Sequence, residues 1–215
     1  MAGRSGMRHL AVAAVVGGAL AGVAAQPAAA VARPVQAPVS AQASVQSLGK
    51  PDVPYATWLK DVQVVADAAS AHVKARVPQL PAGTRPAIVL DIDNSSLETD
   101  YTPGYPTHAI AAILDVARAA HDRGVKVFFV TARPDFIDCF TRYNLTHVGY
   151  PVDGLYGRSL VDLFQETSAF KTAKRQEIEQ NGYTIIANIG NNTTDLVGGH
   201  AEKTFKLPDY DGQLS

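Results

Sequence analysis

Two aspartates, Asp91 and Asp93, directly follow an apolar run and stand two positions apart at the start of a polar loop. Residues at the carboxyl end of a buried strand lie where open α/β sheets bind their ligands. Two carboxylates in such a place can divide the work, because one can attack an electrophile while the other transfers a proton, and together they can hold a divalent cation. The pair therefore favours phosphoryl transfer over the alternative, an acidic cap after a strand.

Three further polar groups follow the same pattern along the chain. Thr131 ends a second apolar run, a third run ends in the segment 190–195, and Lys171 lies near the start of the helix expected before that third run. A phosphate monoester needs a nucleophile, cationic and hydrogen-bonding groups for its oxygens, and a proton for the leaving group. These residues supply each of them, apart from a metal ion that must come from solution.

The elements that would position these residues alternate between strand and helix, which predicts a parallel sheet. Each central run is apolar throughout, as expected when helices cover both faces. The predicted fold is therefore α/β, a Rossmann-like three-layer sandwich with a central parallel sheet. The expected strands are 87–92, 125–130, 183–189 and 204–207, and the expected helices are 55–77, 108–123, 134–143 and 168–180.

Two details of these elements can be checked against a structure. Helical spacing predicts that one face of the first helix, beginning with Tyr55 and Leu59, packs on the core. Pro134 suits the first turn of the third helix. The stretch that follows, with Gly149 and Gly154, is expected to form a loop.

Residues 1–30 have the layout of a secretory signal peptide, with Arg4 and Arg8 before an apolar run and small residues after it. The run, 10–25, counts 16 residues and is shorter than the roughly 20 that span a bilayer. We expect cleavage and a secreted protein with no stable membrane anchor; a retained anchor is the alternative.

The rest of the chain is expected to comprise a flexible linker, 31–54, and one domain, 55–215. The formal net charge is −1, and no basic tail is present, so nucleic acid is not an indicated partner. Cys139 is the only cysteine, which excludes an internal disulfide. We expect its side chain to be buried as a small apolar group. The sequence makes no prediction of the oligomeric state.

Four motifs in order resemble the acid phosphatase branch of the haloacid dehalogenase (HAD) superfamily, of the class B or vegetative storage protein-like type. The resemblance covers about residues 55–210 and is specific because every motif falls on the expected element. The motifs are Asp91-x-Asp93-x-Ser95, Thr131 after the second apolar run, Lys171, and the segment from Gly190 to Asp195.

The resemblance implies a role for each of these residues. Asp91 would be the nucleophile that forms an aspartyl-phosphate, and Asp93 would be the general acid and base. Ser95, Thr131 and Lys171 would form the phosphate-binding set, with Ser95 as a support in the loop. Mg²⁺ would be the cofactor, and its implied ligands are Asp91, Asp93 through its main-chain carbonyl, Asn191 and Asp195.

The chain departs from the family pattern at Asn191, where Gly-Asp-x-x-x-Asp is usual. An amide oxygen is a competent ligand for a hard cation but carries no charge. We expect Mg²⁺ binding to be weaker by about 10–100-fold. The alternative function is therefore a catalytically impaired HAD-fold binding or storage protein. A nucleotide-binding oxidoreductase is disfavoured, because no Gly-x-Gly-x-x-Gly follows a strand.

Spacing also limits the surroundings of the site. Forty residues separate Asp91 from Thr131, and forty more separate Thr131 from Lys171, so neither gap holds a large cap domain. An open site, rimmed by the loop 97–107 with Tyr101 and Tyr105 and with the first helix as a further candidate, suits varied small-molecule phosphomonoesters. Two roles stay open: Arg133 could bind phosphate or form a salt bridge, and Lys174 could replace Lys171.

Overall fold

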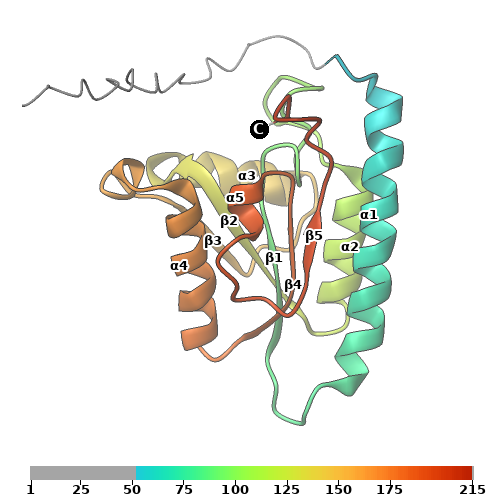
Figure 1. Cartoon of the computed structure of the whole chain (residues 1–215), viewed down its shortest axis with the longest axis vertical. Helices are drawn as coiled ribbons and strands as arrows, with labels where there is room; N and C mark the ends of the chain where they lie inside the picture. The colour runs from blue at the N-terminus through green and yellow to red at the C-terminus, as the bar shows by residue number, and fades with distance from the viewer. Residues whose placement is uncertain (1–51, 215) are drawn as a thin grey trace, which may run out of the picture. The chain divides into compact units, whose positions relative to one another are not determined.

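The computed structural model describes residues 52–214, and its centre is a five-stranded sheet (Figure 1). All neighbouring strands are parallel, in the order β3-β2-β1-β4-β5. The predicted α/β fold with a central parallel sheet is confirmed. The strands are β1 (Pro86–Leu90), β2 (Lys126–Pro134), β3 (Gly154–Arg158), β4 (Thr184–Gly190) and β5 (Thr204–Lys206).

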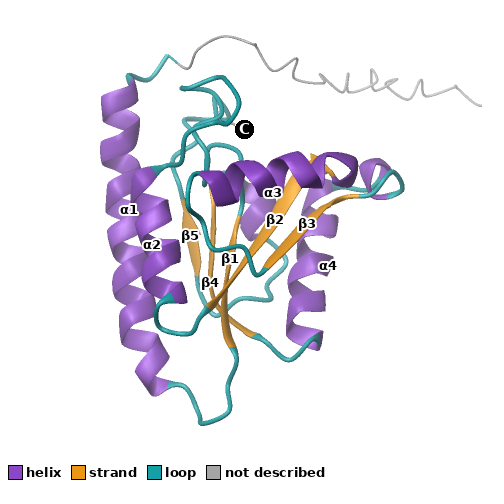
Figure 2. Cartoon of the chain, turned by 180° about the vertical axis from the view of Figure 1, so that it is seen from behind, coloured by secondary structure: helices purple, strands orange, loops and turns teal. Residues whose placement is uncertain are grey.

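Helices cover both faces of the sheet and complete the three layers. Figures 1 and 2 show α1 and α2 on one face and α4 on the other. No helix within the described range is long and apolar enough to cross a membrane. The α-helices are α1 (Tyr55–Arg76), α2 (Ala111–His121), α3 (Asp138–His147), α4 (Thr167–Gln180) and α5 (Thr193–Leu196), and short 3₁₀ turns cover Val77–Gln79, Asp135–Ile137 and Asp162–Phe164.

The sheet separates two apolar clusters. The larger one joins α1 and α2 to the sheet and includes Trp58 and Ile113; the smaller one lies under α4 around Phe170. The predicted apolar face of α1 begins at Trp58, which is fully buried, whereas Tyr55 is 38% exposed. Trp58 continues the i, i+4 spacing of Val62 and the residues after it, so it belongs to the same face of the helix.

The prediction for Gly154 was wrong, because this residue begins β3, an edge strand that pairs with β2. A Cβ at Gly154 would lie 2.5 Å from the ring of Phe128. Glycine is thus required here by close packing rather than by a turn. Pro134 was also misplaced: it ends β2, opposite Arg158 of β3, and α3 begins only at Asp138.

The expectation for Cys139 was wrong as well, since this residue is exposed. Helix α3 turns Thr141, Asn144 and Leu145 inward. Asn144 accepts a hydrogen bond from the main-chain N–H of Thr107 and donates one to its carbonyl, both at 2.8 Å. The buried face of α3 is therefore partly polar, and apolarity alone does not identify it. Between residues 91 and 171 the described elements leave no room for a large cap domain.

Candidate functional site

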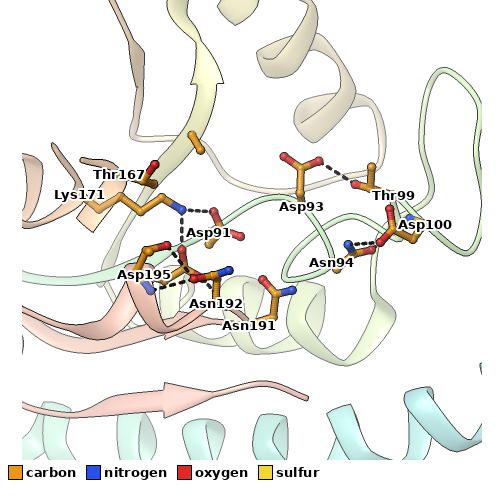
Figure 3. A pocket seen from close by; sticks show the side chains of 12 residues that line it. Asp91, Asp93, Asn94, Thr99, Asp100, Thr167, Lys171, Asn191, Asn192 and Asp195 are labelled. Carbon is orange, nitrogen blue, oxygen red and sulfur yellow. Dashed lines mark hydrogen bonds and ion pairs between the residues drawn. The ribbon is translucent and has the colours of Figure 1, made fainter. Parts of the chain in front are cut away.

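A pocket of about 450 Å³ opens at the carboxyl ends of β1 and β4 and beside the start of α4 (Figure 3). Its size is in the range of small-molecule sites. Five of the seven predicted site residues line the pocket: Asp91, Asp93, Lys171, Asn191 and Asp195. The other two, Ser95 and Thr131, are buried and do not line it.

Asp91 is fixed where β1 ends. Its main-chain N–H donates to the carbonyl of Ile189 on β4 at 3.0 Å, so the strand pairing extends to this residue. The hydroxyl of Ser96 donates to the main-chain carbonyl of Asp91 at 2.6 Å. The parallel sheet thereby holds the carboxylate of Asp91 at its carboxyl edge, as the apolar run predicted.

Lys171 joins two carboxylates in a buried group, and Figure 3 shows its side chain reaching toward both. Its Nζ donates to Oδ1 of Asp91 at 2.7 Å and to Oδ1 of Asp195 at 2.5 Å. Each of the three side chains is at most 8% exposed. Lys174 instead pairs with Glu177 near the surface, so it is Lys171 that the fold brings to Asp91.

The charges of this group depend on one another. Burial raises the pKa of Asp91 to about 6, helped by the charges of Asp195 and Asp93 and opposed by Lys171. Burial also acts to lower the pKa of Lys171, but Asp91 and Asp195 outweigh it and hold that pKa above its ordinary value. The ionisation of Asp91 and that of Lys171 therefore depend on each other.

Asp93 forms a second ion pair on the more open side of the pocket. Arg133 donates from Nε to its Oδ2 at 2.9 Å and from Nη2 to its Oδ1 at 2.6 Å, and Thr99 donates to Oδ1 at 2.8 Å. Burial acts to raise the pKa of Asp93, but Arg133 outweighs it, and the pKa lies below its usual range. Of the two roles left open for Arg133, the structure contains the salt bridge.

The hydroxyls of Ser95 and Thr131 form hydrogen bonds with residues other than those of the buried lysine group, and neither residue lines the pocket. The hydroxyl of Thr131 accepts from the main-chain N–H of Arg133 at 3.2 Å. The hydroxyl of Ser95 donates to Oδ1 of Asn191 at 3.0 Å and accepts from its main-chain N–H at 2.9 Å. The hydroxyl of Ser95 thus joins the loop after β1 to the loop after β4, whereas the contact of Thr131 stays within β2.

The loop after β4 is shaped by a helix cap. Asn192 accepts from the N–H of Thr194, and Asp195 accepts from the N–H of Asn192 at 2.8 Å, which together form the capping box of α5. The sequence contained this signal, since the pattern Asn-x-x-Asp predicts a helix start. At Gly190 a Cβ would lie 2.4 Å from Oδ2 of Asp195, so only glycine lets the carboxylate lie this close to β4.

Arg175 is a support that sequence reasoning missed. It lies one turn after Lys171 on the same face of α4 and is almost fully buried. It donates to the carbonyl of Asp195 at 2.7 Å and to that of Gly199 at 2.9 Å. The i, i+4 spacing from Lys171 was a usable signal, because it places both cations on one side of the helix.

The predicted rim was wrong in its residues. Tyr101 stacks on Trp58, with ring centroids 4.5 Å apart, and Tyr105 donates to the carbonyl of Phe140 at 3.0 Å. Neither tyrosine lines the pocket; the same loop contributes Thr99 and Asp100.

Residues 104–213, just over half of the chain, match the family described as HAD superfamily, subfamily IIIB (acid phosphatase). The chain belongs to this family. The match includes Lys171, Asn191 and Asp195 and begins after Asp91 and Asp93.

Individual relatives of this subfamily IIIB chain match it over less of its length than the family does. The Stem 28 kDa and Stem 31 kDa glycoproteins of Glycine max are each 32% identical to it over 93 residues, or 40% of this chain. The match spans about a third of their lengths, 35% and 31% respectively.

Two solved structures share its fold. The Class C acid phosphatase from Bacillus anthracis is 18% identical, with a TM-score of 0.53 over 73% of this chain and 85% of that one. The same enzyme with tungstate bound is 17% identical, with a TM-score of 0.57 over 74% and 83%.

Proposed function

We propose that this acid phosphatase family member is a Mg²⁺-dependent phosphomonoesterase that works through an aspartyl-phosphate on Asp91. The observation that carries the proposal is the state of the two Asp91 oxygens. Lys171 holds Oδ1, while Oδ2 accepts no hydrogen bond from the described residues. One oxygen is therefore oriented and the other is available to attack, which is the arrangement a carboxylate nucleophile needs.

The proposed reaction has two displacements at phosphorus. In the first, Oδ2 of Asp91 bonds to phosphorus, the bond to the leaving oxygen breaks, and Asp93 supplies the proton for that oxygen. In the second, Asp93 takes a proton from water, whose oxygen attacks phosphorus and frees Asp91. Lys171 offsets charge on the phosphoryl oxygens as a point cation.

Arg133 gives Asp93 a way to change roles. In the pair with Arg133 the carboxylate of Asp93 is held ionised, which suits the base of the second step. A phosphoryl group offers Arg133 a competing anion with matching fork geometry. Release of Asp93 from this pair would allow it to carry the proton that the first step requires.

The residues present fit a magnesium site of low charge. Mg²⁺ prefers carboxylate and carbonyl oxygens, which the proposed ligands Asp91, Asp93 (main-chain carbonyl), Asn191 and Asp195 supply. Within residues 52–214 no three or more His, Cys, Asp or Glu side chains are grouped to hold a metal ion. Each of the three carboxylates is instead paired with a cation, Asp91 and Asp195 with Lys171, and Asp93 with Arg133. When bound, the ion would neutralise phosphoryl oxygens, and we propose that Asp91 is its main anionic ligand.

The second candidate function is a binding or storage protein that kept the fold. Asn191 favours it, because the substitution removes one carboxylate from the family pattern. Both proposals include export of the protein, directed by a proposed signal peptide at residues 1–30. This segment and nearly all of the proposed linker, 31–54, lie outside the described residues. The proposed catalytic domain is 55–215.

Hydrolysis of p-nitrophenyl phosphate across a Mg²⁺ titration tests the proposed function. Asp91→Asn should lower turnover by on the order of 10⁶-fold, or to the background of the assay, as removal of a covalent nucleophile does. Asp115→Asn on the exposed side of α2 is the matched control and should leave the rate unchanged. Turnover retained in Asp91→Asn would refute the mechanism. A folded wild-type protein inactive at saturating Mg²⁺ would favour the binding protein.

A further inference from the structure

Asn191 is almost fully buried, and its polar groups are engaged by three separate segments. Ser95, in the loop after β1, bonds to its main-chain N–H and to its Oδ1. Its Nδ2 donates to the main-chain carbonyl of Leu214. Lys206, at the end of β5, donates to its carbonyl. One residue thus connects the two loops that carry Asp91 and Asp195 to the end of the described chain.

Leu214, the partner of the Asn191 Nδ2, belongs to residues 207–214, which we call the C-terminal segment. This segment packs against the rest of the domain. Leu214 is fully buried in the larger apolar cluster. The hydroxyl of Tyr210 donates to Asp61 on α1 at 2.8 Å, and the N–H of Leu207 donates to the carbonyl of Gly190 at 2.9 Å. Figure 1 shows the C-terminal segment, in red, near the green loop after β1.

These contacts require an amide at position 191. The side chain must accept from Ser95 and at the same time donate to Leu214. A carboxylate could do the first but not the second, and it would bring a negative charge against a carbonyl oxygen in a buried place. The carbonyl of Leu214 would then be a buried acceptor without a donor, which is unfavourable because it has lost its hydrogen bonds to water. Aspartate, the residue usual in the family, is thus a poor fit to this C-terminal segment.

We propose that Asn191 is a positioning residue whose amide ties the candidate site to the C-terminal segment, and that this segment is part of the scaffold of the site. The proposal deepens the proposed function and rests on it for the identity of the site. It changes the meaning of the substitution: Asn191 is required by a contact of this chain, and restoring aspartate should disrupt that contact rather than repair the site.

The test compares Asn191→Asp with Asn192→Asp by thermal unfolding, without Mg²⁺ and with Mg²⁺. Both changes turn an amide into a carboxylate in the same loop. The side chain of Asn192 acts as an acceptor, from Thr194, and aspartate caps a helix equally well. Asn191→Asp should lower the unfolding midpoint by about 3–10 °C in both conditions. Asn192→Asp should change it by less than about 2 °C.

Hydrogen exchange locates the effect. The amides of Gln213 and Leu214 should exchange faster in Asn191→Asp, while those of β1 should not change. If that variant does not fold, Asn191→Ala removes the amide without adding charge and should show the same faster exchange. Asn192→Ala is its control, because loss of that cap affects α5 instead.

The opposite results would overturn the inference. An Asn191→Asp protein as stable as the wild type without Mg²⁺ would show that the C-terminal segment does not require an amide at position 191. One that Mg²⁺ stabilises beyond the wild type would show that ligand charge, rather than the contact with Leu214, decides which residue suits this position. Equal losses in the two aspartate variants would identify a general charge effect. None of these readouts depends on turnover, so an inactive protein would refute the proposed function without deciding this question.

Discussion

The two ion-paired groups of the candidate site are built from similar residues but have different surroundings. Lys171 lies between Asp91 and Asp195, and their side chains are 4%, 8% and 3% exposed. Arg133 and Asp93 face each other on the other side of the pocket, with side chains 19% and 38% exposed. The first group is closed to solvent, and the second is partly open to it.

The difference in exposure assigns the two groups different tasks. A buried charge that loses its partner cannot turn to water, so the Lys171 group must stay intact for the protein to fold. A partly exposed pair contributes less to stability than a buried one, and it can exchange partners at smaller cost because water reaches its charges. We infer that the closed group supports the nucleophile permanently, and that the open pair is the part of the site that rearranges during a reaction cycle.

The largest expected effect is that of Lys171→Met. The change leaves Asp91 and Asp195 buried without a cation, and it should lower the free energy of unfolding by about 3–5 kcal/mol. Urea denaturation measures this loss, and the aryl phosphate assay should find no turnover. Lys174→Met, one turn away in an exposed pair, should change stability by less than about 1 kcal/mol. Similar losses of stability in both variants would show that burial of the lysine does not determine how much its ion pair stabilises the protein.

Asp93→Asn should separate activity from folding. General acid–base groups contribute about 10²–10⁴-fold to a rate, so turnover should fall by that amount. Stability should change by no more than about 1 kcal/mol, because the pair with Arg133 is partly exposed. Steady-state kinetics and urea denaturation of the same preparation check both numbers. A stability loss as large as that of Lys171→Met would contradict the proposed contrast between the two groups.

The closed group could be predicted from the sequence and the open pair only in part. Apolar runs fix strand ends, and parallel strands bring their ends to one edge, so Asp91 and Asp195 were predictable neighbours. Lys171 followed from a motif rather than from its local sequence. Arg133 lies near the end of β2, but its partner depends on side-chain geometry, which no spacing rule supplies.

The strand at Gly154 and the contact of the Asn191 amide with Leu214 could not be read from local sequence, for the same physical reason. Glycine is usually interpreted as a turn signal. At Gly154, however, glycine is required because the ring of Phe128 on the neighbouring strand leaves no room for a Cβ. Asn191 was interpreted through its own motif, whereas its amide bonds to Leu214, 23 residues further along the chain. Both depend on a contact between distant segments, which local pattern cannot contain.

Arg133→Lys tests the geometry of the open pair while keeping its charge. Lysine cannot form the two parallel bonds that Arg133 makes with Asp93, so the carboxylate should be less well oriented. Misplacement of a catalytic group is costly, and we expect kcat/KM to fall by about 10–100-fold. Arg142→Lys on the exposed side of α3 should have no effect. An unchanged rate in Arg133→Lys would mean that the fork does not position Asp93.

Thr99→Val should have the smallest effect and sharpens the same comparison. Thr99 donates one hydrogen bond to Asp93, which Arg133 already holds by two. Valine keeps the shape of the side chain and removes the hydroxyl, so the rate should fall by less than about tenfold, or 1.4 kcal/mol. Thr102→Val, in the same loop, removes a hydroxyl that bonds to the carbonyl of Glu98 and should leave the rate unchanged. A loss as large as that of Arg133→Lys would place the control of Asp93 in this loop, and the open pair would then be no freer to rearrange than the closed group.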